Sequence, residues 1–192
     1  MGCDIHVYLE YTDKEELEKY QRGERRDIHG NPAKPYWRDF GGRINPGRNY
    51  WMFGFLSKGV RSNFSDGLPA KGLPEFNERG YHSRNDSVCY ITDKESSDGD
   101  SVTLETAMRW AEGGCKLHNN SNGQPQWVDH PDWHSHTWLT TEEYERAINL
   151  YKEHCKSAGE IDNPIEYVAL LSAMKTFDEN GYVARLIVWF DN

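Results

Sequence analysis

Residues 3–11 read CDIHVYLEY, in which apolar and polar side chains alternate strictly. Successive residues of an extended chain face opposite sides, so this pattern predicts a half-buried strand with one polar face. Residues 182–190 read YVARLIVWF and follow an Asp-Glu-Asn-Gly turn, which predicts a second and more central strand. We expect the two terminal strands to lie in the same sheet, side by side.

Capping residues between the two terminal strands predict several helices. A capping box at Thr140 and Glu143 predicts a helix that runs to Cys155. Asn163 as a cap and Pro164 at the first position predict another, which ends near Lys175. Two further helices are expected, one at residues 103–112 and a short one that begins directly after Asn49. Residues 13–20 form a third candidate, with a weaker apolar stripe.

These elements predict an α+β fold in a single domain, residues 1–192. We expect a small mixed or mainly antiparallel sheet that includes both terminal strands, flanked by three to five helices and long loops. The long loops are residues 23–47 and 115–131, which are rich in polar residues, Gly and Pro. Loops of this length in a compact domain often carry function.

Composition narrows the class of protein. The chain has 22 basic and 31 acidic residues, a formal net charge of −9, which disfavours binding to a nucleic-acid polymer. No stretch approaches the roughly 20 apolar residues of a membrane span, and the first residues do not resemble a secretory signal. The four cysteines form no CxxC pair, so we expect reduced thiols in a cytoplasm rather than a zinc knuckle.

Two pairs of residues could carry chemistry. Asp4 and His6 project from the same face of the first strand, where a carboxylate can orient an imidazole; the alternative is a solvated surface pair. Farther along, His134 and His136 alternate in the stretch DWHSHTW, so both can point into one pocket if it is extended. Such a pair suits zinc ligation or metal-free acid–base chemistry. The side chains of Trp133 and Trp138 could line the pocket around these two histidines.

A third group of residues could hold an anion. Arg48 and Arg61 offer forked donors that match phosphate or carboxylate, while Tyr50 could stack on a base. Asn49 lies between them in the same segment. The alternative is that the arginines only cap the ends of a core helix.

These blocks together resemble a family of small phage and prophage-encoded proteins of unassigned function that begin with Met-Gly-Cys-Asp-Ile-His. The resemblance is carried by that hexapeptide, GRNY at 47–50, Val60-Arg61, KGLPE at 71–75, HSHTWLT at 134–140 and RLIVWFDN at 185–192. Relative to the family, residues from about 80 to 130 are interpreted as an insertion. The resemblance implies a phage setting in the cytoplasm of a bacterial host, where accessory proteins often counter defence signalled by small nucleotides.

The function we expect is a hydrolase of the phosphodiesterase type that cleaves a small, cyclic or signalling, nucleotide. Arg48 and Arg61 would hold the phosphate, with Asn49, Tyr50, Ser135 and Trp138 as further binding residues. His134 and His136 would act as acid and base, and Asp4 would orient His6. In a second variant, Asp4, His6, His134 and His136 bind a divalent metal, with zinc as the expected ion.

The alternative function is a protein that binds a small nucleotide signal without cleaving it. Aromatic side chains would then stack on the base and arginines would hold the phosphates. In both cases the partner is a small phosphate-containing ligand, with no membrane and no nucleic-acid polymer. The sequence leaves open whether copies of the chain form a homo-oligomer.

Overall fold

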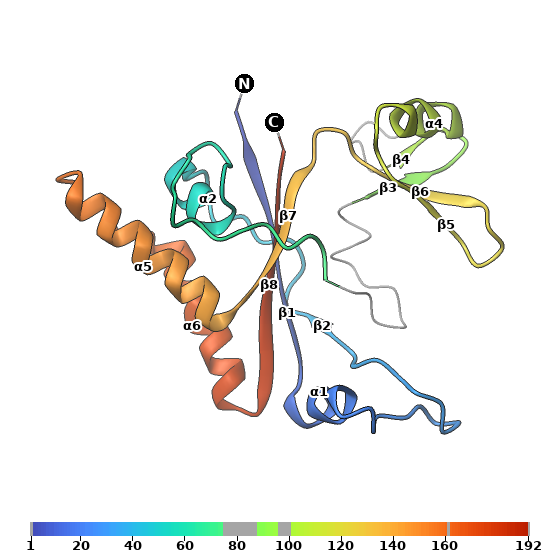
Figure 1. The fold of residues 1–192 in the computed structure, drawn as a ribbon, viewed down its shortest axis with the longest axis horizontal. Coiled ribbons are helices and arrows are strands. Elements are labelled where there is room, and N and C mark those ends of the chain that lie inside the picture. Colours follow the sequence, from blue (N-terminus) through green and yellow to red (C-terminus); the bar gives the residue numbers. More distant parts are fainter. Residues whose placement is uncertain (1, 75–87, 96–100, 161, 192) are drawn as a thin grey trace.

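The computed structural model describes residues 2–74, 88–95, 101–160 and 162–191 (Figure 1). Within these ranges the chain forms five helices and two four-stranded sheets, which confirms the predicted α+β class. The central sheet has the strand order β2-β1-β8-β7, and the second sheet has the order β4-β3-β6-β5.

The two terminal strands form the middle of the central sheet. β1 (Asp4–Asp13) pairs antiparallel with β8 (Tyr182–Asp191) over all 10 of its residues, so the predicted pairing is confirmed. The prediction that β1 is half-exposed is wrong, because its polar face is covered as well: His6 is 5% exposed and Glu10 is fully buried. The outer strands are β2 (Arg38–Asp39) next to β1 and β7 (His134–Thr140) next to β8.

Three helices cover one face of the central sheet (Figure 1). They are α2 (Tyr50–Leu56), α5 (Thr141–Ser157) and α6 (Ile165–Glu179). Their apolar side chains pack against the odd-numbered residues of β1 and the even-numbered residues of β8 in the main core. Within the described ranges, no helix combines the length and the apolar character needed to cross a bilayer.

The helix starts follow the sequence signals with one exception. α5 begins with the predicted capping box, and Asp13 caps α1 (Lys14–Gln21) at the end of β1. In α6, Pro164 holds the cap position and no side chain caps the helix, so the predicted cap at Asn163 is wrong. A proline cannot donate a backbone hydrogen bond, which suits it to the unsatisfied first turn.

A buried ion pair fixes the register of the central strands. Glu10 of β1 stands opposite Arg185 of β8, and the guanidinium donates from Nε at 2.8 Å and from Nη2 at 2.6 Å to one carboxylate oxygen. The guanidinium carbon of Arg185 lies over the Trp37 ring, 3.7 Å from the ring centroid. A one-residue slip between β1 and β8 would separate the buried charges of Glu10 and Arg185, which is unfavourable, so this ion pair favours a single register.

The second sheet lies on the side of the central sheet away from the helices (Figure 1). It comprises β3 (Val88–Ile91), β4 (Ser101–Val102), β5 (Leu117–Asn119) and β6 (Pro125–Asp129), together with α4 (Leu104–Glu112). The prediction of a long loop at residues 115–131 is wrong, because β5 and β6 pair antiparallel there. The sheet falls in the stretch interpreted as an insertion, of which residues 80–87 and 96–100 are outside the described part.

Candidate functional site

His6 is held by a carboxylate from the other terminal strand. Its ring stacks on the indole of Trp189, with the centroids 5.1 Å apart and the planes 14° from parallel. Its Nε2 lies 3.0 Å from Oδ2 of Asp191. Trp189 and Asp191 are two residues apart on β8 and project to the same face as His6. Burial lowers the pKa of His6, although the hydrogen bond to Asp191 acts in the opposite direction.

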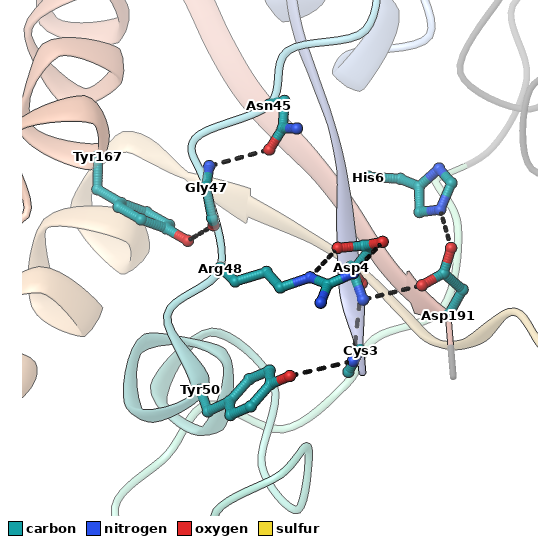
Figure 2. A network of polar contacts seen from close by, with 9 residues as sticks. All are labelled: Cys3, Asp4, His6, Asn45, Gly47, Arg48, Tyr50, Tyr167 and Asp191. Carbon is teal, nitrogen blue, oxygen red and sulfur yellow. Dashed lines mark hydrogen bonds and ion pairs between the residues drawn. The ribbon is translucent and has the colours of Figure 1, made fainter. Parts of the chain in front are cut away.

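Asp4 has a different partner (Figure 2). Its carboxylate accepts two hydrogen bonds from Arg48, one from Nε and one from Nη2 at 2.8 Å, and the bonds from Arg48 lower the pKa of Asp4. The backbone N–H of Asp4 donates to Oδ1 of Asp191 at 2.8 Å. The expectation that Asp4 orients His6 is therefore wrong, because Asp191 holds that imidazole. Arg48, expected to hold a phosphate, is engaged by Asp4.

A bulge in β7 separates the two histidines of the HSH stretch. His134 pairs with Phe190, and the register with β8 then shifts by one residue. Ser135, at the bulge, has a φ of 54°, in the left-handed region. His134 consequently lies against Phe190, at 6.2 Å between centroids, in the helix-covered half of the sheet. His136 lies 6.0 Å from Trp189 on the opposite face, so the expectation that both point into one pocket is wrong.

Five rings form a continuous group between the central sheet and the second sheet. We call His6, His130, His136, Trp133 and Trp189 the histidine–tryptophan cluster. Trp133 connects it, because its ring centroid is 4.8 Å from His130, 5.6 Å from His6 and 6.2 Å from Trp189. His130 in turn is 5.0 Å from Trp110 of α4. The cluster therefore joins the two sheets, and each of its three imidazoles contacts a tryptophan ring of the cluster.

Two nitrogens of the cluster are buried without a hydrogen-bond partner in the described ranges. They are Nε2 of His136 and Nε1 of Trp189. Burial lowers the pKa of His136 to about 4, although the charge of Asp129 acts in the opposite direction. The imidazole is therefore neutral near pH 7. Buried polar atoms in proteins are normally paired, so the described chain leaves hydrogen bonding incomplete at both nitrogens.

A second carboxylate–imidazole pair comes from the second sheet. Nε2 of His118 on β5 lies 2.7 Å from Oδ1 of Asp129 on β6. Burial raises the pKa of Asp129, but the hydrogen bond from His118 and the charges of His118 and His136 outweigh burial, and the pKa is lowered. Asp129 thus acts electrostatically on His136 from across the boundary between the two sheets.

Several other predicted site residues are engaged in the fold. Oδ1 of Asn49 caps α2 by accepting from the Met52 backbone at 3.0 Å, and its Nδ2 donates to Tyr151 at 2.8 Å. The hydroxyl of Tyr50 accepts from the Cys3 backbone at 3.4 Å, and the guanidinium of Arg61 lies 5.6 Å from the Tyr50 ring centroid (Figure 2 shows Tyr50 and Cys3).

Two predicted binding residues lie along β7. The hydroxyl oxygen of Ser135 is 2.9 Å from Nδ1 of His134, and the ring of Trp138 is covered by the ammonium of Lys71 at 3.6 Å from its centroid. Ser135 is therefore directed to His134 and not to His136. The ring of Trp138 packs against the buried residues of the cluster's face of the sheet.

The four predicted metal ligands do not meet. Across the described ranges, no three His, Cys, Asp or Glu side chains are close enough together to hold a metal ion. Asp4 is paired with Arg48, and His134 lies on the opposite face from His6 and His136. The predicted four-ligand zinc site is therefore not assembled in this fold.

The site that remains is the histidine–tryptophan cluster, with Asp191 and the His118–Asp129 pair beside it. The sequence interpretation missed Asp191, although it alternates with Trp189 and so could have been assigned to the same face as His6. The His118–Asp129 pair could not be found before the hairpin was known. Comparison with known proteins adds nothing to this geometry: no protein-family model, curated protein or solved structure matches the chain.

Proposed function

We propose that the protein hydrolyses a phosphodiester bond in a small nucleotide, with His6 and His136 as the acid–base pair. One observation carries the proposal: the two imidazoles lie on the same face of the central sheet, on the strands that flank β8, and both stack on Trp189. Two imidazoles placed at the two ends of a scissile bond can divide the work, one accepting a proton and the other donating one.

His136 is suited to accept the proton. Because its pKa is lowered to about 4 by burial, it is neutral near pH 7, and its Nε2 has no competing partner in the described part of the chain. This nitrogen is enclosed, so a ligand must displace the side chains around it before the neutral Nε2 can take a proton from the water that attacks phosphorus. The negative charge of a bound phosphate would raise the pKa of this imidazole and strengthen it as a base.

His6 is suited to donate the proton. Burial lowers the pKa of His6, and the hydrogen bond to Asp191 at Nε2 acts against that lowering. The negative charge of a bound phosphate would further favour the charged form, in which Nδ1 can protonate the oxygen that departs from phosphorus. The attacking water gives its oxygen to phosphorus and one proton to His136. The products are a phosphomonoester and a free hydroxyl group, and solvent resets both imidazoles.

The ligand would be held by rings and by positive charge. Trp133 could stack on a base, and Arg43, whose charge acts on His6, could approach a phosphate. Arg48 is engaged by Asp4, and Arg61 lies beside Tyr50 of α2 on the helix-covered face. Consistent with the family resemblance, the nucleotide we favour is one that carries a host-defence signal. Cleavage would then end that signal.

Binding without cleavage is the second candidate, and one observation favours it. Burial lowers the pKa values of both His6 and His136, so little of either imidazole is charged near pH 7 without ligand. A site with no charged acid holds a nucleotide by stacking and neutral hydrogen bonds. Sequestration would remove a signal as effectively as hydrolysis does.

One experiment distinguishes the two candidates. The purified protein is incubated with a panel of cyclic dinucleotides and ADP-ribose derivatives, and the supernatant is analysed by chromatography before and after heat denaturation. New products demonstrate hydrolysis, whereas an intact nucleotide released only by heating demonstrates sequestration. A parallel incubation with a chelator tests whether a metal takes part.

Variants then test the assigned roles. We expect His136→Ala and His6→Ala each to lower the rate by about 10²–10⁴-fold, the usual contribution of a positioned acid or base. His29→Ala, on an exposed loop, is the matched control and should keep the full rate. Full activity in His136→Ala would show that the acid–base assignment is wrong.

A further inference from the structure

A cavity of about 220 Å³ opens at the other end of β1 from the histidine–tryptophan cluster. It lies between the C-terminal end of α1 and the loop that follows, and we call it the α1 cavity (Figure 1 shows α1 and this loop). Its lining is Tyr20, Gly23, Arg25, Arg26, Pro32, Ala33 and Lys34. His6 and Asp13 are seven residues apart on β1, which separates His6 from the start of α1 by roughly 23 Å.

The cavity has a prearranged cation. Nη1 of Arg26 donates to the carbonyl oxygens of Gly23 at 2.6 Å and of Arg25 at 2.9 Å, and within the described part of the chain Arg26 pairs with no carboxylate. These two bonds fix the guanidinium, while its other donors stay available. Arg25 differs, because its Nε donates to Glu16 at 3.0 Å.

The rest of the cavity offers apolar surface. The aromatic ring of Tyr20, the ring of Pro32 and the buried methyl group of Ala33 line it. Drug-sized ligands occupy cavities of roughly 300–1,000 Å³, and a cavity of about 150 Å³ can take benzene. The α1 cavity therefore fits one ring or one branched side chain, and not a nucleotide.

We infer that the α1 cavity binds a small apolar carboxylate, either a free aromatic or branched acid or the C-terminal residue of a peptide. The forked donors of Arg26 match a planar carboxylate, and the walls match the apolar group attached to it. Because Glu16 already pairs with Arg25, the cavity suits a single negative charge better than the double charge of a phosphate. This inference does not depend on the proposed hydrolase activity.

The test is a titration of ¹⁵N-labelled protein followed by NMR. The probes are 3-phenylpropionate, a short peptide that ends in phenylalanine, and the same peptide with an amidated end. We expect the two carboxylates to shift the resonances of residues 20–34 and the amide to leave them unchanged. Binding of the free acid alone, or of the peptide acid as well, supports the site and distinguishes a metabolite from a protein terminus.

Variants make the result specific to Arg26. Arg26→Ala should weaken binding at least tenfold, because a charged hydrogen-bond pair is lost. Arg22→Ala is the matched control: Arg22 is exposed at the same helix end, pairs with Glu24 at 2.9 Å and is outside the cavity lining. The inference is overturned if the amide binds as well as the acid, if both variants weaken binding equally, or if millimolar acid shifts nothing.

Discussion

Folding changes the ionisation of His136, because its imidazole is buried against Trp189. Its pKa is about 4 in the folded protein, against about 6.5 in an unfolded chain. Between these values the unfolded chain binds a proton that the folded protein does not, so the free energy of unfolding falls as the pH drops from about 6.5 to 4. The loss is of the order of 3 kcal/mol. The lowered pKa values of His6 and His130 act in the same direction.

We therefore predict that His136→Phe makes the protein less sensitive to acid. Phenylalanine keeps a ring against Trp189 but cannot take up a proton. Urea unfolding at pH 7.5 and pH 5 should show a smaller loss of stability in the variant than in the wild type. His29→Ala, which removes an exposed imidazole, should behave like the wild type. Equal pH dependence in His136→Phe and the wild type would contradict the assigned pKa.

For single residues of β1, the alternating pattern predicted which face a side chain takes, but not its partner. Alternation placed Asp4 and His6 on one face, and both lie there. Arg48 arrives from a loop 44 residues away in sequence and engages Asp4 with two hydrogen bonds, while Asp191 reaches His6 from 185 residues away. The local pattern can give the face of Asp191, but which side chains then pair depends on the whole fold.

At the level of single elements, β7 shows how one residue can reverse an interpretation. The HSH stretch predicts two imidazoles on one face only if the strand is regular. Ser135 interrupts it with a left-handed conformation, for which a Gly or Asn would be the usual sequence signal. The hairpin of β5 and β6 was missed for a related reason, because strands of 3 and 5 residues are too short for a clear alternation.

The bulge gives a prediction about stability. Ser135→Gly should leave the free energy of unfolding unchanged or raise it by less than about 1 kcal/mol, because glycine adopts positive φ without strain. Ser135→Val should lower it by about 1–2 kcal/mol or more, because a β-branched residue is disfavoured there. Chemical denaturation of the two variants measures both effects. A valine variant as stable as the glycine variant would mean that the bulge is absent.

At the level of the whole molecule, the two sheets differ in how much core they have. The buried cluster of the second sheet comprises Cys89, Val102, Ala107 and Val128, whereas the central sheet shares an extensive core with three helices. Few buried contacts give a low free energy of local opening. We predict that backbone amides of the second sheet exchange with solvent faster than those of β1 and β8, as measured by hydrogen exchange with mass spectrometry.

The histidine–tryptophan cluster should control this difference, because Trp133 connects the sheets. Trp133→Ala should accelerate exchange in the second sheet at least tenfold and leave β1 and β8 unchanged. Trp51→Ala is the control, since Trp51 packs beside His154 in the helix layer and should leave the second sheet unaffected. Exchange of both sheets at one common rate in the wild type would contradict the prediction.

The pairing of β1 with β8 also governs how the chain can fold while it is being made. β1 leaves the ribosome about 170 residues before β8, the strand that completes its hydrogen bonds. Until β8 emerges, the nascent chain exposes an unpaired strand edge, which can pair wrongly with other chains. A stop codon anywhere before β8 would therefore leave β1 and β7 without the strand that lies between them, and we expect such products to be aggregated or degraded.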